Sequence, residues 1–426
     1  MKSIMNLKGS PLKPRTSLFP LFLTVFLDLL GLGIVIPIFA PLFLDPVGGL
    51  FSFQTGLSTR TMLLGFLLAI YPLTQFFGAP FLGALSDRFG RKQILQLSLL
   101  GTLFGYLLLA AGILLKSLPL LFIARAVDGF TGGNISIAQS AISDLSDEKS
   151  RTRNFGFIGM AFGLGFIIGP FIGGKLADPS ILSWFNYATP FWFAAILTGI
   201  NLVLVQLRFQ ETLRSRRETP LDFLSGFRNI GRALSMPNAR TMFLVVFLLA
   251  FGFNFFTQFF QVFLIQKFQF TQSQIGDLFA YIGLWIAITQ GLINRPLSRR
   301  LEAPQILSFS ALLLAVALPL LLLPSQSSFL FFLLPLVAIF QGLTQPSSLS
   351  IVSGLCDAKA QGQILGINQS FQSLAQAIPP IIAGFIVSLD QNLPILVAGV
   401  SVLAAWVLFL VYRAGVRRRG PEKVCD

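Results

Sequence analysis

The chain contains no histidine and only two cysteines among its 426 residues. Without histidine, neither a Ser-His catalytic pair nor a metal site of clustered His and Cys can form. A Gly-Lys-Ser/Thr phosphate-binding loop is also missing, which argues against coupling to ATP. The sequence therefore predicts that the protein is not an enzyme and holds no metal or cofactor. Cys356 and Cys425 fall in segments that we place in the cytoplasm, so we expect free thiols.

Charged residues are also scarce, at 11% of the chain, whereas soluble domains carry about 25%. Hydrophobic residues make up 54%, and the mean hydropathy is +0.77. These values indicate an integral membrane protein. Twelve apolar runs are long enough to cross a bilayer as helices. They lie near residues 18–43, 61–82, 94–115, 119–142, 154–176, 189–207, 241–264, 274–294, 305–323, 329–352, 363–388 and 393–412.

The fold class predicted from these runs is an all-α membrane protein with twelve transmembrane helices in two six-helix halves. The longest polar segment separates six runs from six. We expect a cytoplasmic N-terminus (1–17), an N-terminal half (18–207), a central loop (208–240), a C-terminal half (241–412) and a cytoplasmic tail (413–426). Glycines and prolines recur in the fifth and eleventh runs, which suggests that the halves are weak repeats of each other.

The net charge of +14 would suggest a nucleic-acid partner in a soluble protein. Here the 31 Lys and Arg residues divide by side of the membrane: 26 on one side, four on the other, and Arg125 inside a run. An excess of cations marks the cytoplasmic side of a membrane protein. We therefore expect no nucleic-acid partner. We place the protein across a cell membrane, the bacterial inner membrane in the first instance, with both termini cytoplasmic.

A short polar stretch, Gly83-Ala84-Leu85-Ser86-Asp87-Arg88-Phe89-Gly90-Arg91-Lys92, separates the second and third runs. Its charges cannot lie in lipid, so it forms a tight turn at the membrane surface. Asp144, at the inner end of the fourth run, can bond to Arg91 or Arg88 as a structural latch. The predicted gating residues are Gly83, Asp87, Arg88, Gly90, Arg91 and Asp144.

Three ionisable residues lie within the apolar runs. Asp28 is in the first run, and Arg125 and Asp128 lie three residues apart on one face of the fourth, where they can pair. Ionisable residues at such depth are costly and usually functional. We assign Asp28, Arg125 and Asp128 to proton coupling. The alternatives are a structural Asp28 bonded to a neighbouring helix and an ion pair that only fixes packing.

The fifth run has a glycine pattern typical of close helix packing, with a proline that bends the helix. Its members are Gly156, Gly165, Gly169, Pro170, Gly173 and Gly174. A set of amides, concentrated in the second half, suits a polar cavity for a neutral or amphipathic ligand. These are Asn134, Asn254, Gln258, Gln261, Gln290, Gln341, Gln345, Gln369 and Gln372. The alternative for each amide is a hydrogen bond between helices, worth ~0.6 kcal/mol on average.

The turn at Gly83–Lys92 resembles the signature loop of the major facilitator superfamily, and the glycine pattern is similar to the motif of its antiporters. From Phe26 to Glu211 the chain resembles the twelve-span drug/proton antiporters, most of all the tetracycline branch. That resemblance implies that Asp28 is a proton or substrate site and that Arg125 supports it. It also implies that Asp87 caps the eleventh helix in the outward-facing state. Unlike that branch, this chain has Gly105 in place of an acid and has no histidine.

These features together predict a proton-coupled antiporter that exports a small amphipathic molecule or drug. We expect its partners to be a small-molecule substrate, protons and the lipid bilayer, and we expect a monomer. One alternative is a facilitator or symporter for a sugar or organic anion that binds to Arg125. Another is a sensor or scaffold that has the same fold but does not transport.

Overall fold

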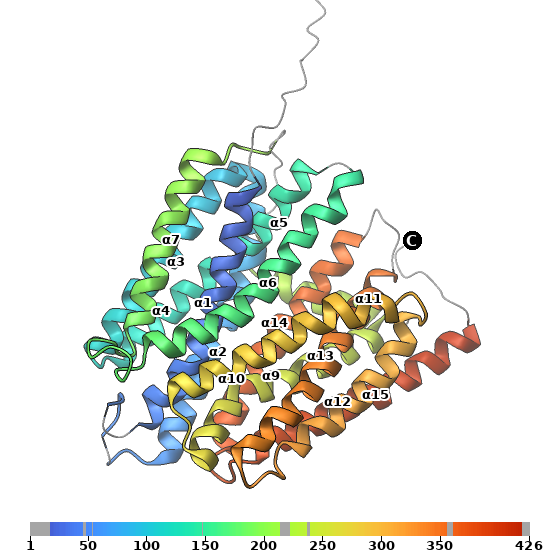
Figure 1. Ribbon diagram of the computed structural model, residues 1–426. Coiled ribbons are helices and arrows are strands. Elements are labelled where there is room, and N and C mark those ends of the chain that lie inside the picture. The colour runs from blue at the N-terminus through green and yellow to red at the C-terminus, as the bar shows by residue number, and fades with distance from the viewer. Residues whose placement is uncertain are drawn as a thin grey trace, which may run out of the picture.

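The computed structural model describes residues 18–45, 48–52, 54–146, 148–213, 222–236, 239–355 and 361–419. Within these ranges the chain forms helices and no strand, so the predicted all-α class is confirmed (Figure 1). Cys356 and Cys425 lie outside the described residues.

The helices follow the predicted apolar runs closely. The first half contains α1 (Phe19–Leu44), α2 (Leu57–Phe89), α3 (Arg91–Leu114), α4 (Leu118–Thr131), α5 (Asn134–Leu145), α6 (Glu148–Leu176) and α7 (Thr189–Arg208). A short helix, α8 (Ser225–Ser235), follows. The second half contains α9 (Arg240–Phe268), α10 (Gln272–Ile288) with a π-helical turn (Thr289–Ile293), α11 (Asn294–Leu297), α12 (Ala303–Leu320), a 3-10 turn (Ser327–Phe329), α13 (Leu330–Ser353), α14 (Gln361–Ile386) and α15 (Leu393–Arg419).

Nine helices of the described part are long and apolar enough to cross a membrane. Each of the twelve predicted runs coincides with helix, which is consistent with twelve spans. Two features were not predicted. The fourth run is divided into α4 and α5, and α8 forms within the central polar segment.

Two pairs of helices join the halves: α2 lies against α14, and α6 lies against α10. Both pairs meet at glycines. A Cβ atom added to Gly65 would lie 3.1 Å from the Cα of Gly384, and one added to Gly174 would lie 3.1 Å from the Cα of Gly276. Only glycine lets two backbones approach this closely. We call this end of the bundle, where α1 ends and α2 begins, the closed end.

The helices of the two halves diverge toward the opposite end, which we call the open end (Figure 1). The turn between α2 and α3 lies there. At this end α8 packs on both halves: the ring of Phe227 lies 5.0 Å from that of Phe76 on α2, and Asn229 donates a hydrogen bond to Ser370 Oγ on α14 at 3.3 Å. The short helix therefore bridges the halves where α2 and α14 separate.

Interactions of a different kind stabilise the closed end. Arg60, only 7% exposed, donates hydrogen bonds to the carbonyl oxygens of Thr55 at 3.0 Å, Leu44 at 3.2 Å and Ser52 at 2.6 Å. The guanidinium thereby holds the loop between α1 and α2 and satisfies the last carbonyl of α1. Across the halves, Lys175 Nζ on α6 lies 2.8 Å from Asp277 Oδ2 on α10.

Close backbone contact also joins α1 to α6 within the first half. A Cβ atom on Gly169 would lie 2.6 Å from the carbonyl oxygen of Leu30 and 2.9 Å from the Cα of Gly33. Gly165 and Gly173 meet α1 in the same way, one turn to either side. Lipid supplies no hydrophobic force between helices, so this packing contributes directly to their association.

We predict that Gly169→Ala lowers the free energy of unfolding by about 1–3 kcal/mol, because the added methyl group over-packs the seam between α1 and α6. Gly163→Ala is the matched control, since a Cβ at Gly163 on the same helix meets no atom within 4 Å. Thermal melting of the purified protein in detergent measures both. Equal melting temperatures would contradict the role given to the seam.

Candidate functional site

Asp28 lies in the N-terminal half of α1, and its residue is 5% exposed. Its Oδ1 accepts a hydrogen bond of 3.2 Å from Nδ2 of Asn134, the first residue of α5. Asn134 is fully buried. Among the described residues, neither Asp28 Oδ2 nor Oδ1, the one side-chain oxygen of Asn134, has a hydrogen-bond partner. Asn134, which the sequence assigned to the substrate cavity, thus pairs with the predicted proton site.

Arg125 and Asp128 lie on α4 and form the ion pair that their spacing predicts. Arg125 Nη1 is 3.6 Å from Asp128 Oδ2, and both side chains are buried. The guanidinium carbon lies 4.5 Å from the ring centre of Tyr71 and 5.6 Å from that of Phe39. Arg125 is therefore neutralised by a carboxylate and covered by aromatic faces, which attract a cation.

Gly105 on α3 faces this ion pair. A Cβ at Gly105 would lie 2.8 Å from the Cβ of Asp128, so α3 and α4 touch there and leave no room for a larger residue. Asp128 itself occupies the space beside this position. Side chains from α1, α2, α4 and α5 thus form one buried polar cluster, which we call the carboxylate cluster. Its members are Asp28, Tyr71, Arg125, Asp128 and Asn134.

The division between α4 and α5 lies inside the carboxylate cluster. Gly132 and Gly133 separate Thr131 from Asn134, and a Cβ on Gly132 would lie 2.4 Å from the hydroxyl oxygen of Tyr71. Side chains satisfy the carbonyls freed by the break: Gln75 Nε2 donates to Gly132 O at 3.0 Å, and Ser98 Oγ donates to Thr131 O. Hydrogen bonds from α2 and α3 thus stabilise the interruption.

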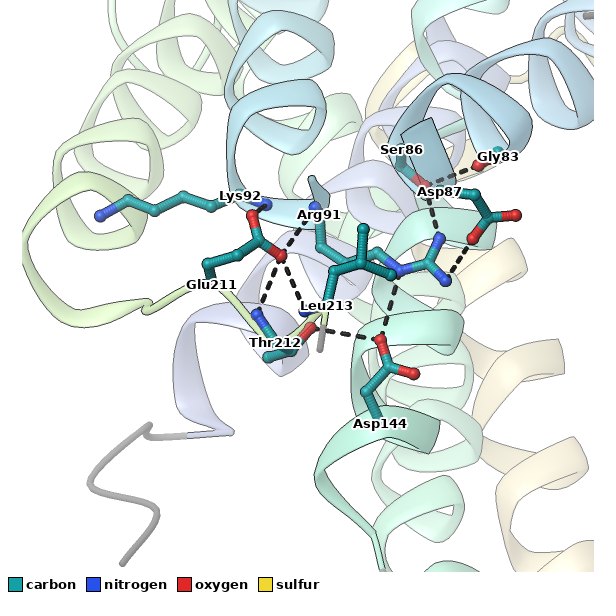
Figure 2. Close-up of polar contacts among 9 residues, drawn as sticks. All are labelled: Gly83, Ser86, Asp87, Arg91, Lys92, Asp144, Glu211, Thr212 and Leu213. Carbon is teal, nitrogen blue, oxygen red and sulfur yellow. Dashed lines mark hydrogen bonds and ion pairs between the residues drawn. The ribbon is translucent and has the colours of Figure 1, made fainter. Parts of the chain in front are cut away.

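A second polar group surrounds the turn between α2 and α3, and Figure 2 shows it. Arg91 lies at its centre: Nη2 is 2.5 Å from Asp87 Oδ1, Nε is 3.3 Å from Asp144 Oδ2, and Nη1 donates to Ser86 Oγ at 2.6 Å. Asp144 is therefore next to Arg91, as expected, while Arg88 lies over the ring of Phe89. Gly90 has a φ of +113°, which favours glycine.

Glu211, which follows α7, completes this turn network and was not among the predicted site residues. Its carboxylate accepts hydrogen bonds from the backbone N–H groups of Arg91 at 2.9 Å and Lys92 at 3.1 Å, and from those of Thr212 and Leu213 (Figure 2). Thr212 Oγ1 donates to Asp144 at 3.3 Å. An acid at the N-terminus of a helix is favoured by the helix dipole. The sequence signal for this role of Glu211 was its position after the sixth apolar run, on the same side of the membrane as the turn between α2 and α3.

The glycines predicted for close packing divide between two contacts. Gly165, Gly169 and Gly173 face α1, whereas Gly174 faces Gly276 on α10, and the carbonyl oxygen of Pro170 would lie 2.4 Å from a Cβ on Gly276. The pattern thus joins α6 both to its own half and to the other half. Gly156 lies in a stretch of α6 whose side chains fall outside the described set. A Cβ atom on Gly83, one of the predicted gating residues, would lie 3.6 Å from Ser136 Oγ.

The predicted amides of the second half do not form one cluster of hydrogen bonds. Asn254 and Gln261 donate to carbonyls of their own helix, Ala250 at 2.8 Å and Gln258 at 3.0 Å. The remaining amides are half-buried (Gln258, Gln341, Gln372) or exposed (Gln290, Gln345, Gln369). A cavity of about 510 Å³ lies at the closed end, where Leu44, Ile265, Gln266 and Leu389 line it together with other residues. Lining of a substrate cavity by the predicted amides stays a prediction.

Comparison with known proteins gives relatives along nearly the whole chain. The Escherichia coli tetracycline resistance protein, class C, is 29% identical over 408 residues, covering 96% of this chain and 98% of its own. The Pasteurella multocida class H protein is 31% identical and covers 87% of this chain and 89% of its own. Multidrug resistance protein 1 of Bacillus subtilis (strain 168) is 28% identical, with 94% and 97% covered.

Solved structures share the fold. The human organic anion transporter MFSD10 (TETRAN) superposes with a TM-score of 0.68 at 24% identity, covering 94% of this chain and all of its own. A D-xylose-proton symporter superposes with a TM-score of 0.73 at 16% identity, covering 93% and 97%. The model of the family described as Major Facilitator Superfamily matches residues 21–263 and 242–424. The chain is therefore a multi-pass membrane transporter that belongs to the major facilitator superfamily.

Proposed function

We propose that the protein is a proton-coupled antiporter that exports a small amphipathic molecule or drug. The observation that carries this proposal is the carboxylate cluster, which holds Asp28 buried inside a bundle built like a transporter. A buried carboxyl with one unpartnered oxygen is suited to take up and release a proton. The similarity to tetracycline and multidrug resistance proteins supports a drug-like cargo.

The proposed location is the bacterial inner membrane, with both termini in the cytoplasm. The open end carries the basic turn and the arginines of α8, and basic residues favour the cytoplasmic side. With this orientation, the described arrangement is inward-facing: the halves meet at the outer end and diverge toward the cytoplasm. We expect a monomer, because the cluster and the turn network are each complete within one chain.

In the proposed cycle, the halves rock about the centre of the bundle. A proton from outside reaches Asp28 past Arg125 and Asp128, substrate leaves, and the proton is released inward after the return. One proton moving down 100 mV supplies about 2.3 kcal/mol, and a tenfold gradient requires about 1.4 kcal/mol. A single proton therefore sustains a substrate gradient of roughly 40-fold without a pH difference.

The turn network would act when the cytoplasmic ends close. Asp87 is bound to Arg91 in the described arrangement. We propose that in the outward-facing state Asp87 caps the start of α14. Glu211 and Asp144 then serve to hold the turn in the shape that presents Asp87, since they fix the backbone of α3 and the guanidinium of Arg91.

We predict that Asp28→Asn abolishes proton-coupled transport and leaves expression near normal, because the amide keeps the shape of the side chain but carries no proton across. Inverted membrane vesicles with a pre-formed pH gradient and a pH-sensitive dye measure this, with tetracycline and other drugs added in turn. Gradient collapse on adding a drug is expected in the wild type and not in the variant. Full activity of Asp28→Asn would refute the role.

The matched control for this measurement is Asp178→Asn. Asp178 lies in the loop after α6 and accepts a hydrogen bond of 2.9 Å from the backbone of Ser180, which an asparagine can also accept. The same chemical change at this loop position should leave the dye response at the wild-type level. If no drug collapses the gradient in the wild type, the uncoupled facilitator and the non-transporting scaffold become the better interpretations.

We predict that Glu211→Ala destabilises the turn by about 0.5–2 kcal/mol, because the first backbone N–H groups of α3 lose the carboxylate that caps them. Transport should slow in the same dye assay, while Asp28 keeps its proton chemistry. Glu302→Ala is the control, since Glu302 caps α12 within its own helix and does not connect separate elements. If the two variants lose the same stability and transport rate, Glu211 has no special function at the turn.

A further inference from the structure

The junction of α4 and α5 places one amide against the proposed proton site. Gly132 and Gly133 interrupt the helix, and Asn134 begins α5 directly after them. A Cβ on Gly133 would lie 2.7 Å from the Cα of Ala79, so the interruption is fixed in place by α2. Asn134 is therefore positioned by backbone geometry, and its side chain faces α1.

Asn134 and Asp28 share one hydrogen bond, and a second bond between them would need one more hydrogen atom. The amide donates to Asp28 Oδ1 at 3.2 Å, while Asp28 Oδ2 and the amide oxygen of Asn134 are acceptors without a donor. Both oxygens are buried away from bulk solvent, and no side chain among the described residues donates to them. A carboxylic acid and a primary amide can form two hydrogen bonds at once: the amide N–H donates to one carboxyl oxygen, and the carboxyl O–H donates to the amide oxygen.

We propose that Asn134 is the positioning residue that responds to the protonation of Asp28. A proton that arrives on Asp28 Oδ2 becomes the missing donor and bonds to the amide oxygen of Asn134, giving a neutral pair with two hydrogen bonds. When the proton leaves, that bond is lost and two oxygen acceptors remain close together. The negative carboxylate is then drawn to the backbone N–H groups at the N-terminus of α5. This inference rests on the proposed proton coupling and names the residue that transmits it.

The surroundings of Asp28 contain other groups that carry charge or a proton. Arg125 and Asp128 face it from α4, Tyr71 from α2 and Tyr106 from α3. The charged residues on the other helices packed against α1 lie near helix ends: Lys175 of α6 pairs with Asp277 of α10, and Arg208 ends α7. Among these neighbours, Asn134 is the one whose side chain is hydrogen-bonded to Asp28.

Asn201 provides a matched control. It is also fully buried, also faces α1, and donates a hydrogen bond of 2.9 Å to Thr24 Oγ1 while its own oxygen has no partner. Its partner is a hydroxyl group that does not titrate. Asn134→Leu and Asn201→Leu therefore remove the same amide from the same kind of site, and only the first removes a contact with a carboxyl group.

The first test measures the infrared band of protonated Asp28 in reconstituted membranes over a range of pH. The band is assigned by its loss in Asp28→Asn. We expect Asn134→Leu to move it to higher wavenumber, because the carboxyl O–H loses its acceptor, and Asn201→Leu to leave it in place. An unchanged band in Asn134→Leu would overturn the proposal. So would removal of the band by sodium chloride at constant pH, since the site would then bind a metal cation.

The second test separates this proposal from the proposed function, with tetracycline as the probe. In Asn134→Leu, the ratio of the transport rate driven by a pH gradient to the rate of tetracycline exchange at equal pH should fall about tenfold, whereas Asn201→Leu should keep the wild-type ratio. A merely structural role would lower both rates alike and overturn the proposal. If the wild type moves no tetracycline and no other drug in response to the gradient, the proposed function fails, whereas the infrared band still decides whether Asn134 pairs with protonated Asp28.

Discussion

The charged groups inside the bundle impose the constraint on which the rest of the site depends. A charge in the middle of a membrane-spanning helix is costly unless its neighbours compensate for it. Arg125 is compensated by Asp128 and by the faces of Tyr71 and Phe39. Among the described residues, Asp28 is hydrogen-bonded by the amide of Asn134. Asp28 therefore differs from Asp128 in having a neutral amide in place of a cation as its partner.

The interruption between α4 and α5 places the end of one helix and the start of the next inside the carboxylate cluster. Discontinuous helices at the centre of transporters expose helix ends to a bound ion or substrate. Here the two glycines accept the approach of Tyr71 and Ala79, and Gln75 and Ser98 satisfy the freed carbonyls. The same tyrosine touches the break and covers Arg125. Asp28 is thus in direct contact with the first residue of α5.

Much of the fold could be predicted from the sequence, because long apolar runs have few alternatives in lipid. The runs and the pairing of Arg125 with Asp128 were found from length, charge and a spacing of three residues. The predicted tight turn over Gly83–Lys92 was too long, because α2 continues to Phe89 and only Gly90 lies between α2 and α3. The break before Asn134 was missed since Gly132 and Gly133 also fit a continuous, closely packed helix. The contact of Asn134 with Asp28 and that of Glu211 with Arg91 join residues more than one hundred positions apart, and no local pattern specifies such pairs. The helix α8 was missed because its eleven residues lie in a segment dominated by arginine and proline.

The glycine contacts at the closed end have a consequence for how such a protein can diversify. The contact between Gly65 and Gly384 on one side and that between Gly174 and Gly276 on the other are made by main-chain atoms. These contacts require the absence of side chains, and Lys175 and Asp277 add a side-chain ion pair between the halves at the same end. Substitutions away from these glycines therefore leave the main-chain contacts of the closed end in place. The closed end and the carboxylate cluster are thus specified by different residues.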